Sequence, residues 1–201
     1  MSVHETAERR RYVWPVLGLV VVALVAAGVV GVRWWQDHAE PAIAGDRLTA
    51  FPAIDRSGLD PAQARIVAVL EREFKAPGDG PKYAEGADEP WCADFVSWVL
   101  READAPLANP NSGSWRIPGV YTLQEYYQDA DRFAPIGSGY RPRTGDVLLY
   151  AEGSPFSQHT NFVLTATNGT VTTMGGNEFG EVAIHRFALA EIPGVVGFGR
   201  L

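Results

Sequence analysis

Cysteine and methionine are nearly absent from this sequence, whose 201 residues include one cysteine and two methionines. The solitary Cys92 cannot form a disulfide within the chain, so any folded domain must be held together by its packed core. Cys92 itself is then expected to be buried, paired between chains or chemically reactive. The residues around it decide among these three roles.

Basic residues are also scarce: 17 Lys and Arg stand against 24 Asp and Glu, which gives a net charge of −7. Beyond residue 35 the balance is more acidic, with 13 basic and 22 acidic residues. Binding of nucleic-acid phosphates requires clustered Lys and Arg, so nucleic acid is not expected as a partner. The sequence contains no zinc-ligand spacing, phosphate-binding glycine loop or internal repeat, so no metal or cofactor is expected.

Long hydrophobic runs are limited to one, near the amino terminus. Residues 15–32 carry no charge, and as a helix they would be about 27 Å long, enough for the hydrocarbon core of a bilayer. Arg9, Arg10 and Arg11 precede the run, and the positive-inside rule then places the chain's beginning in the cytoplasm. We therefore predict a cytoplasmic head at 1–13, one transmembrane helix at 14–35, and the remainder outside the cell. A cleaved signal peptide is the alternative, but the run is too long for one.

The rest of the chain divides into a linker and a domain. Residues 36–58 lack periodicity and contain prolines and glycines, so they are predicted to be an extracytoplasmic linker. Residues 59–201 have the length and aromatic content of one packed domain. Helices are expected from Asp60-Pro61, around Cys92, and at 123–130. Short strands are expected at 147–151, 159–166, 170–174, 182–187 and 195–198. Helices followed by an antiparallel sheet indicate an α+β fold.

Cys92 stands where the second of these helices is expected to begin. Apolar residues recur behind it at helical spacing, and Pro90 and Asp94 fit the first turn of a helix. The positive end of the helix dipole favours the thiolate, which is the nucleophilic form of a thiol. The alternative is that Cys92 is a small core residue, as free cysteines often are.

A cysteine nucleophile needs a base, and the sequence offers four histidines. His4 lies in the predicted head and His38 in the predicted linker, so neither is expected to be held in a site. His159 begins an apolar strand directly after a polar loop, where catalytic groups are commonly held. His185 could lie on either face of its strand. For any single histidine, the alternative is an ordinary packed or surface residue.

Four sequence features stand in order along the chain: Trp91–Trp98 (Trp-Cys-Ala-Asp-Phe-Val-Ser-Trp), Gly145-Asp146-Val147-Leu148, His159 and Gly176-Asn177. Together they resemble the CHAP family of bacterial cell-wall amidohydrolases and peptidases, which depend on cysteine and histidine. The resemblance covers roughly residues 59–201 and implies a papain-like fold related to the NlpC-like hydrolases. It implies that Cys92 is the nucleophile, His159 the base, and Asn177 the residue that orients the imidazole. The reaction it implies is hydrolysis of an amide in peptidoglycan, within the stem peptide or between N-acetylmuramic acid and L-alanine.

The third catalytic position depends on strand register. Many members of the family carry an acidic residue two positions before the asparagine, where this chain has Gly175. A two-residue turn at Asn168-Gly169 would pair His159 with Glu178 and turn Asn177 to the opposite face. We predict a bulge at the paired glycines Gly175 and Gly176, which would return Asn177 to the face of His159. In a regular ladder, Glu178 would be the better third residue.

Aromatic residues near the cysteine helix are candidates for contact with stem peptide or sugar: Trp91, Tyr83 and Trp115, with Tyr121 as a further candidate. Ordinary core packing is the alternative for each. The sequence as a whole predicts a membrane-anchored, outward-facing cysteine amidase or endopeptidase that acts on the peptidoglycan stem peptide. Two other functions stay open, a catalytically silent wall-binding or scaffolding module and a transpeptidase that uses the same thioester.

Overall fold

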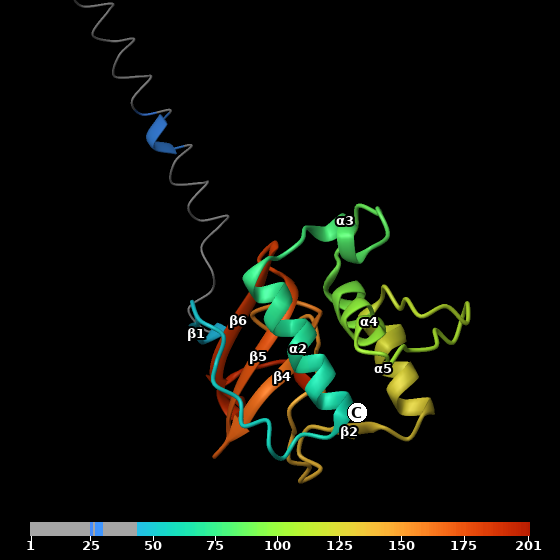
Figure 1. The fold of residues 1–201 in the computed structure, drawn as a ribbon. Helices are drawn as coiled ribbons and strands as arrows, with labels where there is room; N and C mark the ends of the chain where they lie inside the picture. The colour runs from blue at the N-terminus through green and yellow to red at the C-terminus, as the bar shows by residue number, and fades with distance from the viewer. Residues whose placement is uncertain (1–24, 26, 30–43) are drawn as a thin grey trace, which may run out of the picture. The chain divides into compact units, whose positions relative to one another are not determined.

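The computed structural model describes residues 25, 27–29 and 44–201 (Figure 1). The chain divides into two compact units, Met1–Glu40 and Pro41–Leu201. The predicted head at 1–13 lies outside the described residues, and so does the predicted transmembrane helix at 14–35, apart from four helical positions. Among the helices that the structure does describe, none is both long and apolar enough to cross a membrane.

Helix α2 (Pro61–Lys75) begins as its sequence predicts. The side chain of Asp60 accepts hydrogen bonds from the backbone N–H groups of Ala62 and Gln63, both at 2.9 Å. Gln63 in turn accepts from the backbone N–H of Asp60, which completes a capping box. Helices α4 (Cys92–Glu102) and α5 (Val120–Asp129) also occur where they were predicted, although α5 begins three residues early. The short helix α3 (Gly80–Tyr83) was not predicted.

The strands form one antiparallel sheet of seven, in the order β1-β6-β5-β4-β3-β7-β2. The bounds are β1 Asp46–Arg47, β2 Phe133–Pro135, β3 Val147–Tyr150, β4 His159–Thr167, β5 Thr170–Glu178, β6 Glu181–Ala188 and β7 Val195–Gly199. All five predicted strands are present. The two that were not predicted, β1 and β2, are only two and three residues long. Helices with an antiparallel sheet confirm the predicted α+β class.

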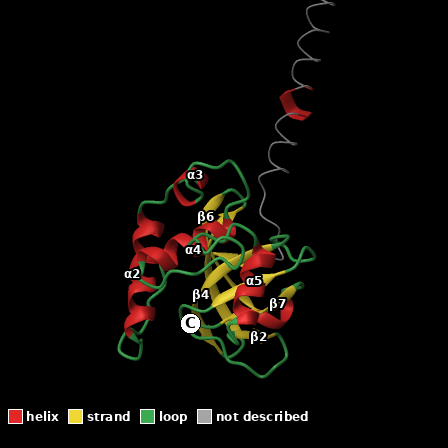
Figure 2. Ribbon diagram, turned by 90° about the vertical axis from the view of Figure 1, so that its right-hand side faces the viewer, coloured by secondary structure: helices red, strands yellow, loops and turns green. Residues whose placement is uncertain are grey.

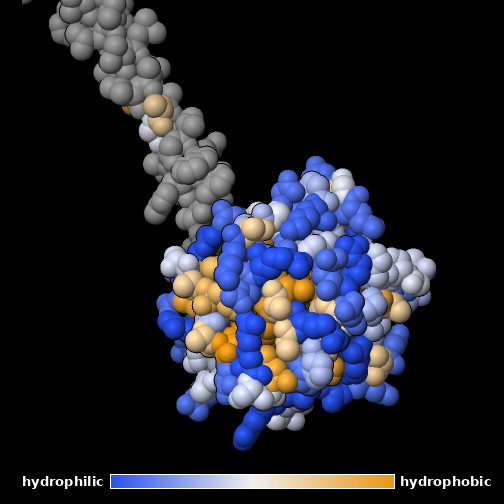
Figure 3. Space-filling model, in the orientation of Figure 1, coloured by the Kyte–Doolittle hydropathy of each residue, from blue (hydrophilic) through white to orange (hydrophobic). Residues whose placement is uncertain are grey.

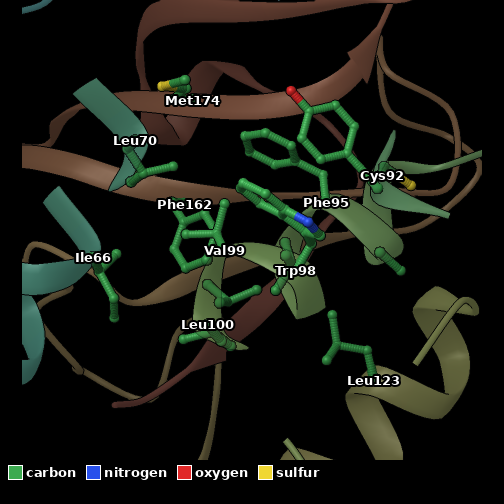
Figure 4. Close-up of a cluster of buried hydrophobic side chains, with 14 of the residues drawn as sticks. Ile66, Leu70, Cys92, Phe95, Trp98, Val99, Leu100, Leu123, Phe162 and Met174 are labelled. Carbon is green, nitrogen blue, oxygen red and sulfur yellow. The ribbon is translucent and has the colours of Figure 1, made fainter. Parts of the chain in front are cut away.

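The hydrophobic core lies between the helices and one face of this sheet (Figures 1 and 2). Helix α4 is its centre, because every residue from Cys92 to Leu100 is buried and the helix packs on β4 and β5. Figure 4 shows the cluster around α4, with Leu70 of α2 and Phe162 of β4 packed nearby. On the face of the molecule shown in Figure 3, hydrophilic side chains surround small apolar patches.

The opposite face of the sheet is buried as well. Alternate residues of β3 show this: Val147 and Leu149 belong to the core under α4, whereas Leu148 and Tyr150 belong to a second cluster. A strand covered on both faces reads as a continuous apolar run, which is the pattern of Val-Leu-Leu-Tyr. The second cluster lies on the same face of the sheet as His159, which pairs with Tyr150 in the candidate site described below.

The predicted linker at 36–58 is corrected in its second half, which belongs to the folded domain. Strand β1 pairs with β6, and the backbone N–H of Leu48 donates to the carbonyl of Ile184 at 2.9 Å. Leu48, Phe51 and Ile54 pack against the core. Prolines and glycines interrupt the periodicity of this segment, so the sequence pattern did not distinguish an extended segment laid on a domain from a free linker.

Replacing Phe51 by alanine is expected to lower the free energy of unfolding by about 2 kcal/mol, because its half-buried ring packs against Phe74. The ring centroids lie 6.0 Å apart. Denaturant unfolding of the full chain measures the change. Tyr121→Ala is the matched control, since that ring is 64% exposed and its loss should change stability little. Equal effects of the two substitutions would mean that Phe51 adds no more to stability than an exposed aromatic ring does.

Candidate active site

Cys92 is the first residue of α4 and follows Trp91 at the helix cap. It is a free thiol and 5% exposed, so burial, one of the three expected roles, is observed. Figure 4 shows Cys92 at the border of the hydrophobic cluster, with its sulfur directed away from Leu70 and Phe162. The sulfur therefore lies at the edge of the core, at the amino-terminal end of a buried helix.

A glycine on the neighbouring strand permits this placement of Cys92. A Cβ atom added to Gly176 of β5 would lie 2.4 Å from Trp91 and 2.6 Å from Phe95, closer than real Cβ atoms approach. The start of α4 therefore packs directly on the backbone of β5. This close approach gives a physical reason for the glycine in the Gly176-Asn177 motif.

His159 is the first residue of β4 and lies beside the thiol. Its side chain interacts with that of Cys92, although 67 positions separate the two residues along the chain. The imidazole is 3% exposed, and the ring of Phe156 stacks on it with centroids 5.4 Å apart. The structure therefore brings together the two residues that the sequence singled out as nucleophile and base.

Two irregularities in the sheet decide which residue contacts the other side of His159. As predicted, β5 is irregular at the paired glycines, where its register with β6 shifts between Gly175 and Glu178. A second shift, around Leu164 of β4, was not predicted. Each bulge shifts by one position the residue of β5 that lies opposite a given residue of β4. The two shifts therefore offset each other. Glu178 lies against His159, and it takes the place that the sequence assigned to Asn177.

Asn177 itself lies in the bulge. Its backbone has a φ of +57°, in the left-handed region that asparagine tolerates better than most residues. Its side chain is half-buried, whereas Glu178 is 1% exposed. Asn177 therefore forms part of the backbone turn, and Glu178 is the residue that contacts His159.

The carboxylate of Glu178 is surrounded by polar partners. Its Oε1 lies 3.5 Å from Nε2 of His159 and accepts a hydrogen bond from Nδ2 of Asn161 at 2.9 Å. Its Oε2 lies 2.5 Å from Nδ1 of His185. Asn161 also contacts the hydroxyl of Tyr150. A buried carboxylate is costly without such partners, and here both oxygens have them.

Electrostatics in the site favour a charged imidazole. Burial opposes its charge, but the contacts with Cys92 and Glu178 outweigh burial and raise the pKa of His159 from 6.5 to about 9. Burial likewise opposes the charge of Glu178, but its contacts with His159 and His185 lower the pKa of Glu178 below its ordinary value. A thiol beside an imidazolium that is backed by a carboxylate is able to attack a carbonyl carbon and to return a proton.

The aromatic residues proposed as substrate contacts divide by burial. Tyr83 is corrected to a core residue: its ring is fully buried, stacks on Trp91 at 5.1 Å, and its hydroxyl donates to Glu73. Trp91 is 8% exposed and adjoins Cys92. Trp115 is half-buried with Arg101 over its ring at 4.1 Å, so it supports the surface of α4.

The segment before α5 is fixed along one face of α4 near the thiol. Nε of Arg116 donates to Asp94 at 2.7 Å, and its Nη2 contacts Glu89. The hydroxyl of Ser97 accepts from the backbone N–H of Ile117 at 3.0 Å. These contacts give the segment a fixed position beside the start of α4.

The Gly145-Asp146 motif is structural in this chain. Asp146 is buried, and its carboxylate accepts from the hydroxyl of Tyr140 and from the backbone N–H groups of Arg143 and Leu201. It holds the loop before β3 and the end of the chain together, away from Cys92 in the sequence and without a contact to it among the described residues.

Sequence reasoning missed three residues of the site. Asn161 could have been found, because it shares the strand parity of His159 and is polar within an apolar strand. The alternation around His185 left its face open, and nothing local linked it to Glu178. Phe156 lies in a polar loop, where a single aromatic carries no positional signal.

Comparison with known proteins bears on this site directly. Residues 83–177 match the family model described as the CHAP domain. No curated protein matches the chain significantly. CHAP domains are generally cysteine- and histidine-dependent amidohydrolases, and the matched segment contains Cys92 and His159 but ends one residue before Glu178. Over residues 83–177, the chain is therefore similar to the CHAP domain.

Proposed function

We propose that this protein hydrolyses an amide bond in the peptidoglycan stem peptide, or at its junction with the glycan, through a thioester on Cys92. The observation that carries the proposal is the buried array of Cys92, His159 and Glu178, in which a thiol, an imidazole and a carboxylate contact one another in series. The family match supports an amidase or peptidase of this class.

The reaction begins with attack of the Cys92 sulfur on the amide carbon. Backbone N–H groups in the first turn of a helix have no intrahelical acceptor, so those at the start of α4 are available to the developing oxyanion. The C–N bond breaks as the imidazolium of His159 gives its proton to the leaving amine, and a thioester remains. Neutral His159 then takes a proton from water, whose oxygen attacks the thioester carbon and releases the carboxylic acid. The thiolate returns, paired with the imidazolium.

Glu178 holds His159 in the orientation that these reaction steps require, and it stabilises the charged form of the imidazole. Trp91 and the segment fixed by Arg116 flank the start of α4, and they are the surfaces against which a stem peptide would lie. Membrane anchoring by residues 14–35, with the catalytic domain outside the cell, is part of the proposal and rests on the hydrophobic run and the arginines before it.

Digestion of purified peptidoglycan tests the proposal. The wild-type protein is expected to release new amino termini, which mass spectrometry locates on the stem peptide or at its junction with the glycan, and Cys92→Ala is expected to release none. Addition of a free amine distinguishes a transpeptidase, which would incorporate it. Equal products from both proteins would refute catalysis by Cys92.

A silent scaffolding module is the second candidate, and the low exposure of the site favours it. Cys92 and His159 are 5% and 3% exposed, so a substrate must displace covering side chains such as Phe156 to reach them. A scaffold would leave peptidoglycan intact, and its thiol would react with iodoacetamide near pH 7 no faster than an unactivated thiol.

A further inference from the structure

We infer that His185 is a positioning residue of this site and acts on His159 through Glu178. The inference deepens the proposed function and rests on it for its meaning in catalysis. His185 lies on β6, is fully buried, and places Nδ1 2.5 Å from Oε2 of Glu178. The other oxygen of that carboxylate lies 3.5 Å from His159. The shorter contact is therefore with His185 and not with His159, the histidine that interacts with the thiol.

The carboxylate needs a fixed anchor at this position of the chain. Glu178 follows the bulge at Asn177 and precedes a tight connection in which Phe179 and Gly180 have φ values of +54° and +90°. Strand pairing holds Glu178 at one point only, opposite Glu181 of β6. The contact between its Oε2 and His185 reaches back across the sheet to the middle of β6, and with Asn161 on Oε1 it fixes both oxygens.

The ring of His185 is itself held in one orientation. Phe156 and Phe179 meet it edge to face, with centroids at 5.3 Å and 5.9 Å. The same Phe156 stacks on His159 at 5.4 Å. One aromatic side chain therefore packs on both histidines, and the two imidazoles approach Glu178 from β4 and β6.

The groups that face Glu178 come from four elements. They are Cys92 of α4 through His159, Tyr150 of β3, His159 and Asn161 of β4, and His185 of β6. Burial raises the pKa of Tyr150 well above its ordinary value, so its hydroxyl stays neutral. The stabilisation of the charged carboxylate is thus divided between the two histidines and the amide of Asn161.

Loss of the His185 contact is expected to shift the pKa of His159 in one direction, which can be measured. This contact lowers the pKa of Glu178, so without it the carboxylate is less well held as an anion. Glu178 in turn raises the pKa of His159, so a weakened carboxylate lets that pKa fall from about 9. The imidazolium is then lost at a lower pH, and the alkaline limb of activity moves in the same direction.

Two substitutions in the full chain, H185N and H185Q, test the inference by geometry. The side-chain amide nitrogen of asparagine falls near the position of Nδ1, whereas that of glutamine falls near Nε2. Asparagine should therefore restore a donor to Glu178, and glutamine should misplace it. The readouts are kcat and KM on peptidoglycan, the pH dependence of both, and the rate of Cys92 alkylation by iodoacetamide at each pH.

We expect H185Q to lower kcat about tenfold, the factor that one pKa unit carries, with KM nearly unchanged and the alkaline limb moved to lower pH. H185N should stay within about threefold of the wild type, with its limb close to the original position. Equal losses in both variants, or losses in neither, would overturn the inference. If the wild-type protein does not cleave peptidoglycan, the proposed function fails, and the alkylation profiles still decide the role of His185.

Discussion

Replacing His159 by alanine is expected to reduce cleavage of peptidoglycan by about a thousandfold or more, because the substitution removes both the proton donor for the leaving amine and the base for water. It also removes the positive charge beside the thiol. Alkylation of Cys92 by iodoacetamide at pH 7 should therefore slow. Peptidoglycan digestion and alkylation rates measure the two effects separately.

The alkylation measurement is clean, because Cys92 is the only cysteine in the chain. Cys92→Ala gives the background of both assays. A thermal unfolding curve is needed for the His159 variant, since the imidazole is 3% exposed and its loss leaves a space beside Phe156. A folded variant that keeps wild-type cleavage would eliminate His159 as the base.

The pH dependence follows from the same contacts. The pKa of His159 is raised from 6.5 to about 9, so the charged imidazole is favoured in the folded protein below that range. Its contribution to stability is fully present below 6.5 and is lost as pH rises through about 9. The wild-type alkaline limb of kcat should fall near the same pH, whereas the acid limb reflects other groups.

The elements that support the site could be predicted from the sequence, because each has a local signal. Asp60-Pro61 marks the start of α2, and apolar spacing marks α4. Strand β1 has no such signal: two residues are too few for a pattern, and Asp46 and Arg47 are both exposed and charged. Only pairing with β6 makes them a strand.

The third residue of the candidate site shows why strand register is harder to predict than the strands themselves. Paired glycines at 175–176 signal one bulge, and that bulge is present. The compensating shift around Leu164 occurs within an apolar stretch that reads as regular. The register shifts of these two bulges offset each other, but only the bulge at the glycines has a signal in the sequence. Reasoning from that bulge alone therefore selects Asn177. Burial is also hard to predict from the sequence. An aromatic residue such as Tyr83 is equally suited to line a groove or to fill the core.

Replacing Glu178 by glutamine is expected to lower kcat about a hundredfold, because the imidazolium of His159 loses the anion that stabilises and orients it. Glutamine has nearly the same shape, but its amide nitrogen is a donor and would meet either Asn161 or His185, which are donors in the native contacts. The pKa of His159 should fall from about 9, and the alkaline limb of kcat should move to lower pH with it. KM should change far less, since Glu178 is 1% exposed and lies behind the imidazole.

Asn177→Gly is the matched control for this substitution, because glycine adopts the φ of +57° at the neighbouring position without strain. If Glu178 orients His159, the glycine variant should keep kcat within about threefold of the wild type, and only the Glu178 variant should move the pH profile. The opposite result, a large loss in Asn177→Gly with little change in Glu178→Gln, would restore the asparagine to the role that the family resemblance implies. The two variants therefore decide whether the offset of two bulges, rather than the order of residues along β5, determines which side chain supports the base.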